Sequence, residues 1–447
     1  MLQPEFLERG EDVKHPFFGG VHPDDGKRLS AGLGPDVGFQ PKTVAILMQQ
    51  HIGAPCTPLV QVGDLVKRGQ KVGDGEGLCV PVHASVSGRV IAVEPRKHPG
   101  GNLVPAVVIE NDLQNTDGSA LIPHPDYETL EPEDLRAIIR EAGIVGHGGA
   151  AFPTERKTQT GQIDTLIANA CECEPYITAD DSLLRRQAEQ VFAGMEIVAQ
   201  ILNPQRLVLA VEDNKQEAIR GLGSRIATPR TNREIALHVL PTRYPQGAEK
   251  QLIQAITGQE VPSGKLPSVT GCAVFNAATF AAVYRAVCAG EPVTRRIVSV
   301  TGEGVQNPNN ILCPIGTSYR ELIDYCGGLR RETEKVLCGG PMMGFAQHDL
   351  SVVTIKGTNA ILCLTDEETR ENPVCIRCGR CVAVCPMRLQ PLYLYRYQQT
   401  ADAAQLRRFH VFDCIGCGCC SYTCPGKLPL AEAARRGKVC AREGMVP

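Results

Sequence analysis

The feature that most constrains this chain is a pair of matching cysteine patterns near its C-terminal end. Each pattern reads C-x2-C-x2-C-x3-C-P. This spacing is typical of proteins with two 4Fe–4S clusters, in which three closely spaced thiolates bind one cluster and the fourth cysteine reaches across to the other. The predicted ligand sets are therefore Cys375, Cys378, Cys381 with Cys424, and Cys414, Cys417, Cys420 with Cys385.

A pair of zinc knuckles is the structural alternative for these cysteines. Zinc sites usually join two ligand pairs that a longer stretch separates, whereas here four cysteines fall within eleven positions, twice. We therefore expect clusters and one-electron transfer. Most of the other twelve cysteines, including Cys56 and Cys79, are expected to be small buried hydrophobic residues. Cys419 breaks the spacing and is expected to be a spare, and the scattered histidines, including His51, show no ligand spacing.

Composition excludes several classes of protein. The chain has 447 residues, room for about three or four domains. A net charge of −3 and the absence of Trp argue against nucleic-acid binding. The N-terminal sequence lacks an apolar signal core, and thiolate-bound clusters need a reducing compartment. No run approaches the ~18 apolar residues of a membrane-spanning helix, so the chain is not expected to cross a bilayer by itself.

The pattern along the chain predicts a multidomain protein of α/β and α+β type. Residues 1–40 are expected to be an irregular lead segment. Residues 41–129 contain short β-type runs separated by Gly and Pro. Two of these runs, at 62–73 and 83–90, resemble the halves of a barrel-sandwich hybrid, the fold of biotinyl and lipoyl carriers. The segment between them has no lysine, which favours a docking or structural module over a swinging-arm carrier.

Strand and helix patterns alternate from about residue 130 to residue 293. Buried-strand patterns at 164–170, 206–213 and 234–241 are each followed by a helical pattern, which predicts a parallel α/β sheet. Residues 294–365 are expected to form a small α+β unit. Residues 366–427 form the predicted cluster domain, with a polar helical stretch between the two cysteine sets, and residues 428–447 form a tail with a short basic helix.

A glycine-rich loop, GIVGHGGAAFPTERK at 143–157, lies at a junction between helix and strand. Glycines let backbone N–H groups approach an anion closely, and Lys157 adds a positive charge. The loop is neither a Walker loop nor a G-x-G-x-x-G fingerprint. Taken alone, the glycine content is weak evidence and is more typical of a structural loop, but together with the segments that follow it predicts a site for a phosphate-bearing cofactor.

Three later segments place polar residues where ligands usually bind. NACECEP at 169–175 follows a predicted strand, at the sheet edge where open α/β sheets bind ligands. YPQGAEK at 244–250 opens a helix, and helix N-termini attract phosphate. NAAT at 276–279 places polar groups before another helix. Glu172 and Glu174 could also form a solvated turn before Pro175.

These segments resemble the flavin site of the FMN-binding subunit family of respiratory complex I. The loop at 143–157 is similar to its G-x-x-G-R-G-G-A-G-F-P-T-G-x-K pattern, and NACECEP, YPQGAEKQL and FNAAT resemble three further motifs in the same order. Nearly the whole chain resembles the RnfC family, whose members belong to Rnf complexes, the ion-translocating ferredoxin:NAD+ oxidoreductases. That similarity includes FFGGVHP, QQHIGAP, VHASVSG, VEDNK, a β-grasp segment at 294–365 and both cysteine patterns.

The resemblance implies FMN on the glycine-rich loop, with NADH stacking on the flavin ring. The matching positions are Gly146, Gly148, Gly149 and Lys157 in the flavin loop, Asn169, Glu172 and Glu174 near the flavin ring and nicotinamide, Tyr244, Gly247 and Glu249 at the start of the nucleotide helix, and Asn276 and Thr279 at the flavin phosphate. Glu172 and Glu174 are the candidate catalytic residues. The family pattern is broken at His147, Cys171 and Ala248.

A flavin and two clusters form a coherent set of cofactors for chemical reasons. Nicotinamide exchanges two electrons as a hydride and a cluster exchanges one, so a flavin is needed between them. The resemblance implies a peripheral subunit on the cytoplasmic face of the inner membrane. Its membrane partners would include an iron–sulfur subunit that exchanges electrons with ferredoxin, and the complex would translocate ions.

Two alternatives remain open at this point. One is a soluble flavin and iron–sulfur reductase such as a cobalamin reductase, although in that family the flavin loop lies close to the N-terminus. The other is an electron-relay scaffold that has clusters and no working flavin site.

Overall fold

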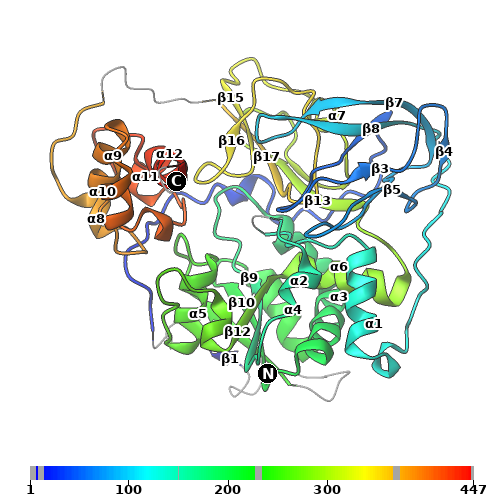
Figure 1. Ribbon diagram of the computed structural model, residues 1–447, viewed down its shortest axis with the longest axis horizontal. Helices are drawn as coiled ribbons and strands as arrows, with labels where there is room; N and C mark the ends of the chain where they lie inside the picture. Colours follow the sequence, from blue (N-terminus) through cyan, green and yellow to red (C-terminus); the bar gives the residue numbers. More distant parts are fainter. Residues whose placement is uncertain (1–6, 9–14, 149–150, 227–233, 366–372, 444–447) are drawn as a thin grey trace.

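The computed structural model describes residues 7–8, 15–148, 151–226, 234–365 and 373–443 (Figure 1). Four folded regions surround an extended N-terminal segment. Figure 1 places the cluster region (α8–α12) at one side, the barrel-sandwich region (β2–β8) at the other, and the central α/β region below the β-grasp region.

The central region contains a five-stranded sheet in which every neighbouring pair is parallel. Its strands, in spatial order, are β1 (Leu7–Glu8), β11 (Ile235–Leu240), β10 (Arg206–Glu212), β9 (Thr165–Ala170) and β12 (Cys272–Asn276). The strands β9 to β12 are almost continuously apolar, as expected for strands covered on both faces. The predicted parallel α/β architecture is confirmed.

Helices form one layer on each face of this sheet. One apolar core joins the sheet to α1 (Pro132–Glu141), α3 (Ala179–Leu202), α4 (Gln216–Ile226) and α6 (Ala277–Ala289). A separate core on the opposite face contains α5 (Glu249–Thr257). The short α2 (Thr154–Lys157) directly follows the glycine-rich loop. The loops at the carboxyl ends of β9 and β12 therefore share one edge of the sheet.

The barrel-sandwich region consists of two small sheets packed on a common core. The first contains β2 (Thr43–Leu47), β8 (Leu103–Asn111), β7 (Gly88–Lys97) and β4 (Leu65–Val66), and the second contains β3 (Thr57–Pro58), β5 (Lys71–Asp74) and β6 (Val82–His83). Alternate residues such as Val44, Val72 and Val107 fill the space between the sheets.

The β-grasp region is a mixed five-stranded sheet with one helix packed on it. Its strands are β14 (Asn309–Pro314), β13 (Arg295–Thr301), β17 (Ala360–Leu364), β15 (Lys335–Cys338) and β16 (Phe345–Ala346), and its helix is α7 (Tyr319–Tyr325). The hydroxyl of Ser318 accepts the Glu321 N–H and caps this helix.

Short helices connected by the cysteine loops form the cluster region. These are α8 (Arg380–Ala383), α9 (Pro391–Gln399), α10 (Ala403–Arg408), α11 (Cys419–Tyr422) and α12 (Leu430–Glu443). A short 3-10 turn, Val411–Asp413, lies between α10 and α11, and the other 3-10 turns of the described residues are Lys27–Leu29, Tyr127–Thr129 and Pro267–Thr270. The helix α12 lies in the segment expected to be a tail. It is part of the cluster region, because Ala434 and Ala441 pack with Leu394 and Leu406.

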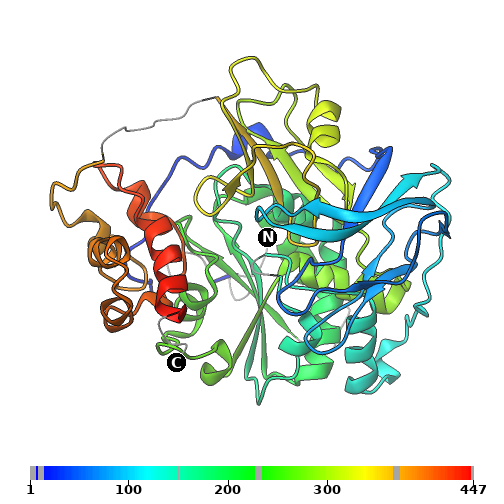
Figure 2. The ribbon, with the colours of Figure 1, turned by 45° about the horizontal axis from the view of Figure 1, so that its top comes forward.

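The N-terminal lead segment connects three of the folded regions (Figure 2). The Gly20 N–H donates to the Val384 carbonyl of the cluster region, and Val21 pairs with Tyr244 of the central region. The Asp36 N–H donates to the Asn310 carbonyl of the β-grasp region. Although the segment is irregular, as its Gly and Pro content predicts, it is held at each of these points. None of the helices in the described part of the chain is both long and apolar enough to cross a membrane.

Candidate functional site

The first predicted cysteine set surrounds one cavity. Cys375, Cys378, Cys381 and Cys424 line a hollow of about 360 Å³ at the end of the cluster region. Cys378 is exposed, and so is Ile376 beside it. Four thiols converging on a hollow of this size suit a cubane cluster, which four thiolates bind.

The second predicted set lines a separate and more deeply buried hollow. Cys414, Cys417 and Cys420 face Cys385 there, and Cys385 and Cys417 are both buried. Backbone N–H groups donate to thiol sulfurs in both sets, from Arg377 to Cys375 at 3.4 Å and from Gly416 to Cys414 at 3.4 Å. Such bonds favour thiolates and influence cluster potentials. Cys419, expected to be a spare, is fully buried and lines the same hollow as the second set.

The glycine-rich loop lies against the N-terminus of α6. The Gly146 N–H donates to the Phe152 carbonyl, which closes the loop, and the His147 N–H donates to Thr279 Oγ1 at 3.1 Å. At Gly148 a Cβ would lie 2.8 Å from Asn276 Nδ2. The loop can therefore come this close to α6 only with glycine at that position. Gly149 lies outside the described residues.

Lys157 and Glu249 converge on the same side of the sheet. Lys157 Nζ lies 2.6 Å from Glu249 Oε1, in a half-exposed ion pair, and 5.0 Å from the centre of the Phe275 ring. Asn276 caps α6 by accepting the Ala278 N–H. The donors of this region are thus an ammonium, a carboxamide, a hydroxyl and backbone amides, which together suit a phosphate.

Asn169 and Gly247 connect two of the predicted ligand-binding segments. Asn169 Nδ2 donates to the Gly247 carbonyl at 2.8 Å, and Asn169 Oδ1 accepts the Cys171 N–H at 3.1 Å. A Cβ on Gly247 would lie 2.2 Å from the Cys171 carbonyl oxygen. The Asn169 side chain therefore fixes the start of the α5 segment against the end of β9.

Each of the two candidate catalytic carboxylates accepts backbone N–H groups. Glu172 Oε1 accepts the Asp180 N–H at 2.8 Å at the start of α3. Burial raises the pKa of Glu172 to about 7, although the nearby positive charge of Lys27 favours the ionised carboxylate. Glu174 Oε1 accepts the N–H groups of Met342 at 2.7 Å and Met343 at 3.0 Å. Burial raises the pKa of Glu174 as well. Both side chains hold neighbouring segments in place, and their action on nicotinamide remains a prediction.

Buried charges around Glu172 were missed by the sequence analysis. Lys27 Nζ donates to the carbonyls of Glu174 at 2.9 Å and Ile177 at 2.6 Å, and burial lowers the pKa of Lys27. Glu212, at the end of β10, is fully buried near Lys27 and Lys215, and burial raises its pKa. Only the position of Glu212 at a strand end could have drawn attention to it, because Lys27 lies in the irregular lead segment.

Tyr244 connects the central region to the second cysteine set. Its hydroxyl donates to the Cys417 carbonyl at 2.7 Å, and its ring packs with Val21, Cys417 and Cys419. Gln251 of α5 also donates to the Pro386 carbonyl at 3.3 Å. The predicted nucleotide helix and the second cysteine set therefore lie in direct contact.

Comparison with known protein families identifies four regions of the chain. Residues 139–285 match the Nuo51 FMN-binding domain, and residues 15–114 match the RnfC barrel sandwich hybrid domain. Residues 297–346 match the SLBB domain, and residues 368–425 match a 4Fe-4S dicluster domain. The predicted fold class is confirmed, as are FMN and 4Fe–4S clusters as cofactors.

Curated relatives cover most of the chain. The C subunit of the Na(+)-translocating ferredoxin:NAD(+) oxidoreductase complex of Acetobacterium woodii is 44% identical, over 87% of this chain and 88% of the relative. The corresponding subunit of a proton-translocating complex of Clostridium ljungdahlii is 41% identical, over 85% and 83%. The C subunit of the ion-translocating oxidoreductase complex of Rhodobacter capsulatus is 41% identical, over 95% and 83%. The chain therefore belongs to the RnfC family, the C subunits of ion-translocating ferredoxin:NAD+ oxidoreductase complexes.

Proposed function

We propose that this protein is the NADH-handling subunit of an ion-translocating electron-transport complex. It exchanges a hydride with NAD(H) and passes single electrons to or from partner subunits and, through them, ferredoxin. When bound, FMN exchanges electron pairs with nicotinamide and single electrons with the 4Fe–4S clusters. The relatives' names support both the NAD+ and the ferredoxin ends of this reaction, and name Na+ or protons as the translocated ion.

The observation that carries the proposal is the contact between the flavin domain and the second cysteine set. Tyr244 lies in a predicted nucleotide segment, and its hydroxyl bonds to the backbone of Cys417. The two regions are about 170 residues apart in the sequence. Direct contact between these two regions supports electron transfer between the flavin and the second cluster.

Residues of the glycine-rich loop and α6 would bind the flavin phosphate. We assign this role to Lys157, Asn276 and Thr279, together with the backbone of Gly146 to Gly149. Lys157 supplies the positive charge, Asn276 and Thr279 lie at the N-terminus of α6, and the absence of a side chain on Gly148 leaves room for close approach. Asn169, Glu172, Glu174, Tyr244, Gly247 and Glu249 would surround the ring and the nicotinamide.

The first cysteine set supplies the surface through which electrons would leave. Cys378 is exposed, and Arg377 and Arg396 line the same cavity. The side chains of Val374 and Ile376 are 64% and 67% exposed. An apolar patch with arginines at its edge suits a partner subunit with an acidic docking surface, including an iron–sulfur subunit that exchanges electrons with ferredoxin. The protein would thus be held by membrane partners on the cytoplasmic face.

Cofactor analysis under anaerobic conditions tests the proposal. Protein purified without oxygen should contain about eight iron atoms and about one FMN per chain. Substoichiometric NADH should bleach the flavin absorbance and then the cluster absorbance. A preparation with iron but no flavin, or one that NADH does not bleach, would contradict the proposed function. Recovery from washed membranes, rather than from the soluble fraction, would separate a membrane-complex component from a free-standing reductase.

A further inference from the structure

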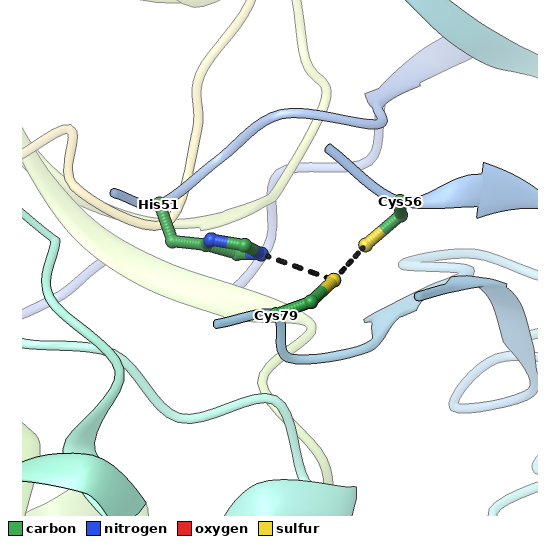
Figure 3. Close-up of side chains that lie close together, drawn as sticks. All are labelled: His51, Cys56 and Cys79. Atoms are coloured by element: carbon green, nitrogen blue, oxygen red, sulfur yellow. Dashed lines mark hydrogen bonds between the residues drawn. The ribbon is translucent and has the colours of Figure 1, made fainter. Parts of the chain in front are cut away.

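Three buried side chains in the barrel-sandwich region form a potential metal-binding cluster. His51 and Cys56 lie in the connection between β2 and β3, and Cys79 lies in the connection between β5 and β6 (Figure 3). They lie outside the flavin site and both cysteine sets, and their exposed fractions are 4–6%. From the sequence, the two cysteines are expected to be small buried hydrophobic residues, and His51 shows no ligand spacing.

The distances within this cluster fit a tetrahedral zinc site. Zinc bonds of about 2.3 Å to sulfur and about 2.0 Å to nitrogen place neighbouring ligand atoms roughly 3.5–3.8 Å apart. The two sulfurs of Cys56 and Cys79 are 3.5 Å apart, and Cys79 Sγ lies 3.7 Å from His51 Nε2. All three ligand atoms lie within 4.8 Å of one another. Figure 3 shows the imidazole edge and both sulfurs pointing toward one another.

The hydrogen bonds of His51 fix the tautomer that a metal ligand requires. Its Nδ1 lies 3.2 Å from the Ile52 carbonyl oxygen, an acceptor, so Nδ1 carries the proton. The Val80 N–H donates to Nε2 at 3.3 Å, so Nε2 is the unprotonated ring nitrogen, and a bound metal ion would replace this N–H on its lone pair. Metal-bound histidines usually hold their second ring nitrogen in this way. The nitrogen aimed at the two thiols is therefore the one able to bind a metal.

Charge balance favours a divalent ion at this position. Binding of Zn²⁺ to both cysteines releases two thiol protons, and the resulting unit of one dication, two thiolates and a neutral imidazole carries no net charge. A neutral unit is suited to a buried position beside Lys356, whose fully buried ammonium donates to the carbonyls of Pro81 and Gly143. Thiolate and imidazole ligands are those that zinc prefers.

We propose that His51, Cys56 and Cys79 bind a Zn²⁺ ion through three protein ligands, which leaves the fourth tetrahedral position to a solvent molecule. The bound ion would fix the loops that support the flavin loop. Ile52, next to His51, donates its N–H to the Ala151 carbonyl at 3.2 Å. Val80, next to Cys79, packs against Val145 and Ala151. This inference does not depend on the proposed electron-transfer function, because metal binding is measured without NADH.

Metal analysis of the complete protein tests the site. Protein purified anaerobically with its full iron content should contain about one zinc ion per chain, and zinc-edge X-ray absorption should reveal about two sulfur ligands at 2.3 Å plus nitrogen or oxygen. Iron clusters do not contribute at the zinc edge. A shell of four sulfurs would place the zinc in a cysteine cluster site and would overturn the proposal, as would the absence of zinc from iron-replete protein.

Matched variants distinguish this site from other thiols. Cys79→Ser should lower zinc retention about tenfold or more while iron and FMN stay unchanged. The control is Cys313→Ser, because Cys313 is also buried but its sulfur contacts the Pro314 carbonyl, Thr354 and Thr317, none of which is a zinc ligand of this cluster. Zinc that persists in Cys79→Ser refutes the assignment. An intact mass that is about 2 Da low and returns on reduction would indicate a Cys56–Cys79 disulfide instead, and would also refute it.

Discussion

Substituting Gly148 by alanine tests the flavin loop at its closest contact. The new Cβ would lie 2.8 Å from Nδ2, 2.9 Å from Cβ and 3.0 Å from Cγ of Asn276. Since contacts this short are not tolerated, Asn276 must move. Because its own Cβ is among the crowded atoms, a change of rotamer alone cannot relieve the overlap.

The free-energy cost of moving Asn276 follows from the two hydrogen bonds that its side chain would lose. Its Oδ1 caps α6 by accepting the Ala278 N–H at 2.9 Å, which is worth about 1 kcal/mol. Its Nδ2 donates to Asp180 Oδ2 at 2.6 Å, and a bond to a carboxylate is worth about 1.5–3 kcal/mol. The sum is about 2.5–4 kcal/mol. If FMN requires Asn276 in its present position, the FMN dissociation constant should rise about 70- to 900-fold.

Fluorescence titration of flavin-depleted protein with FMN, without oxygen, measures this constant. Gly221→Ala is the matched control, since a Cβ there meets nothing within 4 Å and alanine should stabilise α4 by about 0.5–1 kcal/mol. FMN affinity within about threefold of the wild type in Gly148→Ala would refute the proposed loop geometry.

A double-mutant cycle tests whether Gly148→Ala weakens FMN binding by displacing Asn276. In an Asn276→Gly background the crowded side chain is gone, so adding Gly148→Ala should weaken FMN binding by less than about 1 kcal/mol. Full additivity of the two substitutions would mean that Gly148 acts through some other contact.

Three further substitutions test other parts of the arrangement. Cys378→Ser should reduce iron content by about half while FMN stays bound, as measured by iron and flavin analysis. Tyr244→Phe leaves the buried Cys417 carbonyl without its donor, at a cost of about 1–3 kcal/mol, so hydrogen exchange at residues 414–420 should accelerate, whereas the exposed Tyr325→Phe should have no effect there. Burial raises the pKa of Glu172 from 4.5 to about 7, so its ionisation opposes folding, with no penalty below pH 4.5 and the full penalty above about pH 7. Glu172→Gln should therefore reduce the loss of stability between pH 5 and pH 8, as measured by urea midpoints.

Much of the architecture could be predicted because it is encoded in local patterns. The apolar runs that form β9, β10 and β11 are bounded by turns, and the helices after them show clear apolar faces. The two cysteine patterns likewise predict which thiols face each other. Cys424 lies with the first set and Cys385 with the second, as the crossing of the fourth ligand requires.

The contacts of the N-terminal segment could not be predicted in the same way. Lys27 has no helical or strand periodicity around it, yet its ammonium bonds to the carbonyls of Glu174 and Ile177, about 150 residues away. A lysine in an irregular segment normally extends into water, and only the complete fold supplies the carbonyls and buried carboxylates that replace its hydration. Lys27 and Glu212 therefore became visible only in the structure.

The contrast between the cluster cysteines and Cys56 and Cys79 shows which sites sequence spacing can reveal. A cubane brings its ligands from one tight loop, so its geometry imposes a spacing along the chain. A site built between loops of a folded β region imposes none, because the strands bring its ligands together. His51, Cys56 and Cys79 are separated by 5 and 23 residues, yet their side chains meet because β3 pairs with β5 and β5 with β6. A buried thiol pair beside an oriented imidazole can therefore be recognised only in the three-dimensional structure. The zinc content of the protein then decides whether Cys56 and Cys79 are metal ligands or small buried hydrophobic residues.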